Sequence, residues 1–191
     1  MTIFDTFLEI KTPEELYKYM NENIEYGFYG SDNKIHKDID EDFGDYFPFK
    51  YYLMTPEEVL KYRVGMCWEQ AELEREWFKK HNIKHKVFFH MICLDHPNNY
   101  STHTFLAYEM NNKWYWFENS WFDQKGIHEY DSLEELLKTE KEADYELLKT
   151  QGITEEEFSH YEIKEIKRPL FHIKALDYIS FCMDEEIMSD N

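Results

Sequence analysis

The residues of this chain whose types could do chemistry together are one cysteine, one histidine and one glutamate. Cys67 lies where an irregular segment passes into a predicted helix, whereas His103 and Glu118 lie on two strands predicted to pair as a hairpin. A thiol at a helix N-terminus meets unsatisfied N–H groups and the positive end of the helix dipole, which favour the nucleophilic thiolate. An imidazole can then move the proton, and a carboxylate can fix the imidazole tautomer. The three residues are a candidate cysteine-nucleophile triad.

The register of the predicted hairpin decides which side chain partners His103. If Asn111 and Asn112 form a two-residue turn, Glu118 shares a face with His103 and lies diagonally from it, about 7–8 Å away. Asn119 then points away. A three-residue loop would reverse the parity and make Asn119 the partner. We expect the two-residue turn, and therefore Glu118.

The helix that carries the cysteine has recognisable signals at both ends. Gly65 is expected to let the backbone bend sharply just before Cys67. The helix should run to about His81, with Asn82 as a left-handed stop. Trp68 is expected in the core or in the wall of a groove.

Further helices are predicted from a shared capping pattern. A Ser or Thr followed three residues later by Glu allows the two side chains to cap the free N–H groups of a first turn. Pro13 and Pro56 occupy first helical positions, where a missing N–H costs nothing. The four predicted caps are Thr12, Thr55, Ser132 and Thr154.

The remaining elements are predicted to be strands and one long ordered loop. The loop should span residues 26–52, which are rich in glycine and aromatic residues. One of two late apolar runs, Leu170–Ile173 or Ala175–Met183, is expected to be a strand. Three β-branched and aromatic segments are predicted strands: Lys86–Leu94, Thr102–Tyr108 and Trp114–Ser120.

Helices followed by a strand meander and then by mixed elements indicate an α+β fold. The 191 residues suit one domain with an ordinary core. We expect a single domain over residues 1–191. Its N-terminal helical and loop extension should cover about 1–60, and its C-terminal α/β extension about 121–191.

Charge and cysteine content exclude several classes of partner. The formal net charge of −19 disfavours nucleic acid and anionic membranes, because phosphate binding requires clustered Lys and Arg. The N-terminus lacks the pattern of a secretory signal, and no apolar run is long enough to span a membrane, so we expect a cytoplasmic protein. Three irregularly spaced cysteines predict free thiols rather than disulfides.

We expect no cofactor and no metal ion. Histidines and a cysteine crowd residues 81–96 and could suggest zinc, but the predicted strand sends His90 and Cys93 to opposite faces. Cys93 and Cys182 lie among apolar residues and are expected to be small buried side chains.

Three short blocks of the sequence resemble the transglutaminase-like superfamily. They are Val64–Ala71 around the cysteine, Thr102–Phe105 around the histidine, and Trp114–Asn119, and they lie within residues 60–120, about a third of the chain. The resemblance implies a papain-like core, in which a helix bearing Cys67 packs on an antiparallel sheet that carries the histidine and the acid. Glu118 occupies the position where the family usually has Asp, and Glu69 stands where the family often has an acidic residue.

The same resemblance implies acyl transfer at an amide of a peptide or protein substrate, by hydrolysis, deamidation or cross-linking. The motifs do not distinguish water from an amine as the acyl acceptor. The oxyanion would need the Cys67 backbone N–H and a second donor, for which Tyr51 or Tyr52 is a candidate. The alternative is a non-catalytic module that binds a peptide or protein in the same cleft.

Overall fold

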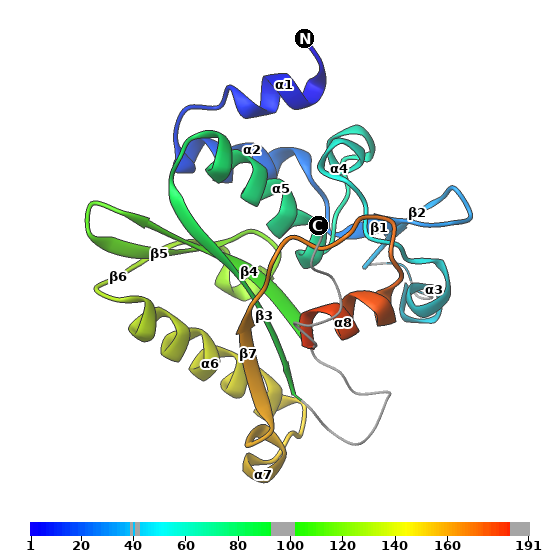
Figure 1. The fold of residues 1–191 in the computed structure, drawn as a ribbon. Coiled ribbons are helices and arrows are strands. Elements are labelled where there is room, and N and C mark those ends of the chain that lie inside the picture. Colours follow the sequence, from blue (N-terminus) through cyan, green and yellow to red (C-terminus); the bar gives the residue numbers. More distant parts are fainter. Residues whose placement is uncertain (39, 41–42, 93–101, 184–191) are drawn as a thin grey trace.

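The computed structural model of the chain describes residues 1–38, 40, 43–92 and 102–183 (Figure 1). The α-helices are α1 (Ile3–Leu8), α2 (Pro13–Asn23), α3 (Phe43–Lys50), α4 (Pro56–Tyr62), α5 (Cys67–Lys80), α6 (Leu133–Thr150), α7 (Glu155–Phe158) and α8 (Ala175–Met183), with a short 3-10 helix η1 (Phe122–Gln124). The strands are β1 (Gly27–Tyr29), β2 (Ile35–Lys37), β3 (Lys84–Ile92), β4 (Thr102–Met110), β5 (Lys113–Glu118), β6 (Gly126–Tyr130) and β7 (Tyr161–Glu165).

An antiparallel sheet with the strand order β6-β5-β4-β3-β7 forms the centre of the molecule. The α+β class predicted from the sequence is therefore confirmed. Side chains alternate between the two faces of each strand. Leu106 and Phe117 pack in the large core with residues of α5, whereas Phe105 and Trp116 pack with Leu136 of α6. Helices α5 and α6 thus cover opposite faces of the sheet, as Figure 1 shows.

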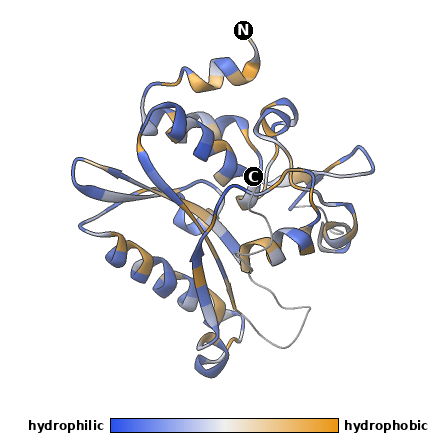
Figure 2. Ribbon diagram, in the orientation of Figure 1, coloured by the Kyte–Doolittle hydropathy of each residue, from blue (hydrophilic) through white to orange (hydrophobic). Residues whose placement is uncertain are grey.

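The helix starts follow the capping pattern seen in the sequence. Thr12, Thr55, Ser132 and Thr154 each accept a hydrogen bond from the backbone N–H three residues later. Helix α5 begins at Cys67 and ends at Lys80, and Asn82 has a φ of 54°. Helix α6 carries both hydrophobic and hydrophilic residues along its length (Figure 2), and Leu136 and Leu148 are among its buried residues.

The hairpin between β4 and β5 has the expected two-residue turn. Met110 pairs with Lys113, and both Asn111 (φ 54°) and Asn112 (φ 61°) adopt the left-handed conformation that a tight type I′ turn requires. Asparagine tolerates this conformation better than other non-glycine residues do. The turn therefore fixes the register of the whole hairpin.

The predicted long loop over residues 26–52 is wrong. This segment contains the hairpin β1–β2 and the helix α3. The two strands have three residues each, too short for a periodic pattern to appear in the sequence, and the Phe28 ring stacks on the His36 ring at 4.9 Å. Helix α3 forms although it contains Pro48, a residue that is unfavourable inside a helix, and Phe47 packs against the Tyr51 ring at 4.9 Å.

The predicted late strand is also wrong. Residues 170–173 form a turn and an irregular segment, and Ala175–Met183 is helix α8, in which Tyr178 and Phe181 are buried. The last strand is instead β7 at Tyr161–Glu165, which pairs with β3. Strand β7 lies at the edge of the sheet, where polar residues are common, so its sequence gave no strand signal. Its backbone pairing with β3 makes it a strand. Within the described residues, no helix is long and apolar enough to cross a membrane.

Candidate active site

Cys67 is the first residue of α5 and is 4% exposed. Local hydrogen bonds hold the backbone around it. The Met66 N–H donates to Glu69 Oε2 at 3.0 Å, and Gln70 Nε2 donates to the Gly65 carbonyl at 2.8 Å. The start of the helix that presents the thiol is therefore fixed by two side chains of its own first turn.

Gly65 has a different role from the one expected. Its φ lies outside the left-handed region, so no special bend requires glycine there. A Cβ at this position would lie 3.3 Å from Glu69 Cβ and from Val59 Cγ1, closer than is usual. The glycine lets α4 and the start of α5 approach each other.

His103 and Glu118 meet across the hairpin. His103 Nε2 lies 2.7 Å from Glu118 Oε2, and the His103 side chain is 12% exposed. The carboxylate accepts further hydrogen bonds from the backbone N–H groups of Ser120 and Trp121, both at 2.8 Å, and from Trp116 Nε1 at 3.2 Å. A buried carboxylate with so many donors stays ionised and holds the imidazole in one orientation.

The charges of this pair reinforce each other. Burial alone would lower the pKa of His103, but the Glu118 carboxylate and the neighbouring Cys67 outweigh it and raise that pKa well above its usual value. Burial alone would raise the pKa of Glu118, but the charge and hydrogen bond of His103, with the backbone donors, lower it. Since Nε2 is taken by Glu118, Nδ1 is the ring nitrogen that remains for the thiol.

Asn119 lies on the other face of the sheet. Its Nδ2 donates to Glu74 Oε1 on α5 at 3.0 Å, and its Oδ1 accepts from Asn21 Nδ2 at 3.0 Å. Neither of these two Asn119 hydrogen bonds is to His103. The Asn119 amide therefore joins α2, β5 and α5.

Tyr26 is a neighbour of the thiol that the sequence did not reveal. Its hydroxyl donates to Cys67 Sγ at 4.0 Å. Burial and the neighbouring Cys67 raise the pKa of Tyr26 well above its usual value, so the hydroxyl stays a donor. Tyr26 is positioned by its neighbour Glu25, whose N–H donates to the Arg63 carbonyl and whose carbonyl accepts from Gly65, each at 3.0 Å.

A cavity of about 220 Å³ adjoins this site. His103, Tyr26 and Ser120 lie on its wall, together with Trp121 from the segment after β5. The imidazole and the hydroxyl next to the thiol therefore face a space that could admit part of a substrate.

A family model described as a transglutaminase-like domain matches residues 5–143. The chain belongs to this transglutaminase-like family. The resemblance inferred from three short blocks is thereby confirmed, and the match takes in most of the segment that we expected to be an N-terminal extension. None of the curated proteins compared with the chain matches it.

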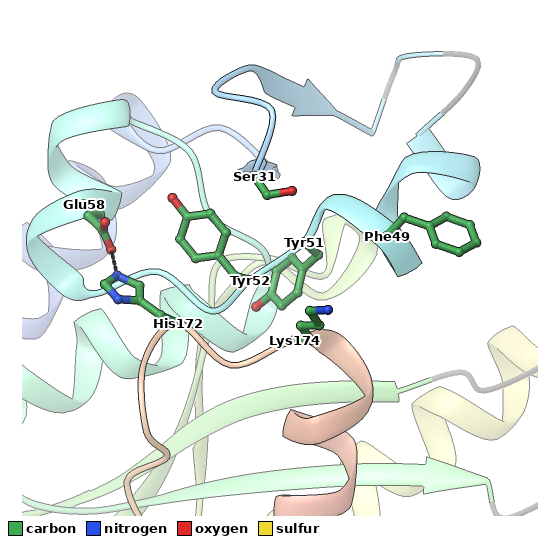
Figure 3. A pocket seen from close by; sticks show the side chains of 7 residues that line it. All are labelled: Ser31, Phe49, Tyr51, Tyr52, Glu58, His172 and Lys174. Atoms are coloured by element: carbon green, nitrogen blue, oxygen red, sulfur yellow. Dashed lines mark hydrogen bonds and ion pairs between the residues drawn. The ribbon is translucent and has the colours of Figure 1, made fainter.

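In this transglutaminase-like domain, neither Tyr51 nor Tyr52 approaches the thiol by a hydrogen bond. The Tyr51 hydroxyl donates to the buried Glu69. Burial raises the pKa of Glu69 to about 7, although hydrogen bonds from Tyr51, Met66 and Met54 act to lower it. Tyr52 lines a separate surface pocket of about 440 Å³ with Tyr51 and Lys174, next to the 2.8 Å pair of Glu58 and His172 (Figure 3).

The remaining residues considered in the sequence, Trp68 and Cys182, are buried in the core. Trp68 is buried and stacks on the Tyr178 ring at 4.3 Å, as expected for a core residue. Cys182 is a buried free thiol, as predicted, whereas Cys93 and His96 lie outside the described residues. Within the described part of the chain, no group of three or more His, Cys, Asp or Glu side chains is placed to hold a metal ion.

Proposed function

We propose that this protein is a thiol-dependent acyltransferase or hydrolase acting on an amide of a peptide or protein, with Cys67, His103 and Glu118 as its catalytic triad. The observation that carries the proposal is the 2.7 Å contact between His103 Nε2 and Glu118 Oε2, close to the Cys67 thiol at the N-terminus of α5. Membership of the transglutaminase-like family supports this chemistry.

The first half-reaction forms a thioester. The Cys67 thiolate attacks the carbonyl carbon, a C–S bond forms, and the carbonyl oxygen takes the negative charge. When the tetrahedral intermediate collapses, the C–N bond breaks and the His103 imidazolium gives its proton to the leaving amine. The high pKa of His103 means that the imidazolium is available at neutral pH.

The second half-reaction releases the acyl group. His103 now takes a proton from the attacking water or amine, a C–O or C–N bond forms, and the C–S bond breaks to regenerate the thiolate. Glu118 stabilises the imidazolium and fixes its orientation in both halves.

We assign two donors near the sulfur to the oxyanion. The Cys67 backbone N–H is at the start of α5, and the Tyr26 hydroxyl lies 4.0 Å from Cys67 Sγ. A substrate oxygen held between these two groups would receive a hydrogen bond from each. We therefore propose Tyr26 as the second oxyanion donor in place of Tyr51 or Tyr52, which were candidates from the sequence.

The alternative function is a peptide-binding module without catalysis. One observation favours it: Cys67 is only 4% exposed, and its Sγ accepts a 4.0 Å hydrogen bond from the Tyr26 hydroxyl. The two functions differ in what they require of the thiol, because only the enzyme needs Cys67 to reach a substrate.

The test is a product search that depends on Cys67. Peptide mixtures are incubated with the protein, with and without a primary amine, and mass spectrometry measures cleavage, deamidation and amine incorporation. The unmodified protein and Cys182→Ala, which alters another buried thiol, should give the same products, whereas Cys67→Ala should give none. Products that persist in Cys67→Ala, or peptide binding without any product, would reject the catalytic proposal.

A further inference from the structure

The wall of the cavity beside His103 contains one buried carboxylate that the proposed triad does not use. Asp144 of α6 and His90 of β3 line the cavity, and they are 3% and 1% exposed. Asp144 Oδ2 and His90 Nε2 lie 3.6 Å apart, and neither atom has a hydrogen-bond partner among the described residues. Buried polar atoms are rarely left in this state, because the lost hydration costs about 1–3 kcal/mol or more.

The surroundings of His90 show which charge is uncompensated. His90 Nδ1 lies 2.5 Å from Glu140 Oε1, and the Tyr161 hydroxyl donates to Glu140 Oε2 at 2.6 Å. Glu140 is therefore satisfied by two partners. Even a protonated His90 could balance only one of the two carboxylates, so Asp144 is the group left in need of a cation.

The pKa of Asp144 points the same way. Burial raises that pKa, the neighbouring His90 and His103 partly oppose the increase, and Glu140 adds to it. A cation held in the cavity would repay the cost of an ionised Asp144.

The size and rim of the cavity fit one charged group. Its volume of about 220 Å³ is below the roughly 300–1,000 Å³ of sites for drug-sized molecules, so it suits a single side chain or a chain end. Tyr26 and Trp121 contribute aromatic rings to the wall, and aromatic faces attract ammonium and guanidinium groups. The net charge of −19 would draw cations toward the molecule.

We infer that this cavity is a specificity subsite for one organic cation, an ammonium or guanidinium group, on the substrate whose amide Cys67 attacks. The inference rests on the proposed function. An amine held by a carboxylate stays protonated and has no free electron pair for attack. The bound cation therefore belongs to the acyl donor and is not the amine that accepts the acyl group.

Direct binding tests the subsite without turnover. Butylammonium, butylguanidinium and neutral butanol are titrated into Cys67→Ala protein at constant ionic strength, and NMR follows the ring signals of His90 and His103. We expect saturable shifts with one or both cations and none with butanol. Comparing the two cations separates a Lys side chain or chain terminus from an Arg side chain as the source of the group.

Matched variants assign the charge. Asp144→Asn should weaken cation binding about tenfold to a hundredfold, as expected for loss of a charge-assisted hydrogen bond. Glu142→Gln removes a charge from an exposed position on the same helix and should leave binding unchanged. Equal responses to butanol and the cations, or unchanged binding in Asp144→Asn, would overturn the inference.

A kinetic arm separates this inference from the proposed function. Peptide substrates carrying Lys or Arg are compared with analogues carrying norleucine or citrulline, and kcat/KM should favour the charged member in the unmodified protein but not in Asp144→Asn. Turnover without a charge preference, combined with no cation binding, would reject the subsite and leave the triad standing. Cation binding without any turnover would retain the subsite and reject the enzyme.

Discussion

Asn119 Nδ2 donates a 3.0 Å hydrogen bond to Glu74 Oε1, on the face of the sheet opposite to the one that carries Glu118. Two adjacent residues of one chain segment thus have separate tasks. Glu118 forms a hydrogen bond with the His103 imidazole, whereas Asn119 forms one with Glu74 of α5. The two residues can be tested against each other.

We expect opposite effects from substitutions at these positions. Glu118→Gln keeps the shape but loses the charge that stabilises the imidazolium, so kcat should fall on the order of 10²- to 10⁴-fold. Asn119→Ala should leave kcat nearly unchanged and lower the free energy of unfolding by about 1–3 kcal/mol, because Glu74 loses its donor. Kinetics and urea unfolding measure the two effects. Loss of activity in Asn119→Ala with tolerance of Glu118→Gln would contradict the assignment.

The His103–Glu118 pair predicts a specific pH dependence of stability. The pKa of His103 is raised on folding, so its stabilising contribution is complete below the unfolded value of about 6.5 and disappears as pH rises through the folded pKa. The pKa of Glu118 is lowered, so its contribution is present above the unfolded value of 4.5 and disappears as pH falls through the folded pKa.

The difference in free energy of unfolding between the unmodified protein and Glu118→Gln should therefore be greatest between the two unfolded pKa values, 4.5 and about 6.5. The NMR titration of His103 should move to lower pH in the variant. Glu129→Gln, an exposed change on β6, is the control. An unchanged His103 titration in Glu118→Gln would show that the carboxylate does not govern the imidazole.

The hydroxyl of Tyr26 is expected to act in catalysis. Tyr26→Phe removes one oxyanion donor and should lower kcat about 10- to 1,000-fold with little change in KM. Tyr29→Phe removes a hydroxyl that bonds to Asn33 at an exposed position and should have no such effect. An equal loss in both variants would indicate damage to the β1–β2 hairpin rather than to the oxyanion site.

Glu69 should make the protein less stable as pH rises. Its pKa rises from 4.5 to about 7 on folding, so the native state binds more protons than the unfolded state between these values, and the free energy of unfolding falls with pH by about 3 kcal/mol. Glu69→Gln should remove most of this slope, whereas the exposed Glu57→Gln should not. Denaturant unfolding from pH 4.5 to 8 measures the slope, and an unchanged slope in Glu69→Gln would contradict the prediction.

Local signals in the sequence predicted the helix caps and the Asn111–Asn112 turn. In each case a few neighbouring residues determine the backbone, so the sequence contains the whole cause. Side-chain alternation along the two strands then extends this local signal to His103 and Glu118, which the turn places on one face of the hairpin.

Elements that depend on distant partners were missed. Strand β7 is polar and becomes a strand by pairing with β3, and α8 is a short apolar run that periodicity cannot distinguish from a strand. Tyr26 was missed for a related reason. It approaches the thiol because Glu25 pairs with the segment before Cys67, and that pairing leaves no pattern in the sequence.

The tight turn between β4 and β5 also has a consequence for the order of folding. His103 and Glu118 are 15 residues apart in sequence, whereas Tyr26 and Cys67 are 41 apart and His90 and Glu140 are 50 apart. A hairpin forms in about 1–10 μs, and the entropic cost of closing a loop grows with its length. We expect the His103–Glu118 pair to assemble before Cys67 joins it. Pulsed hydrogen exchange during refolding should protect the β4 and β5 amides ahead of the Cys67 amide, and simultaneous protection would contradict this order.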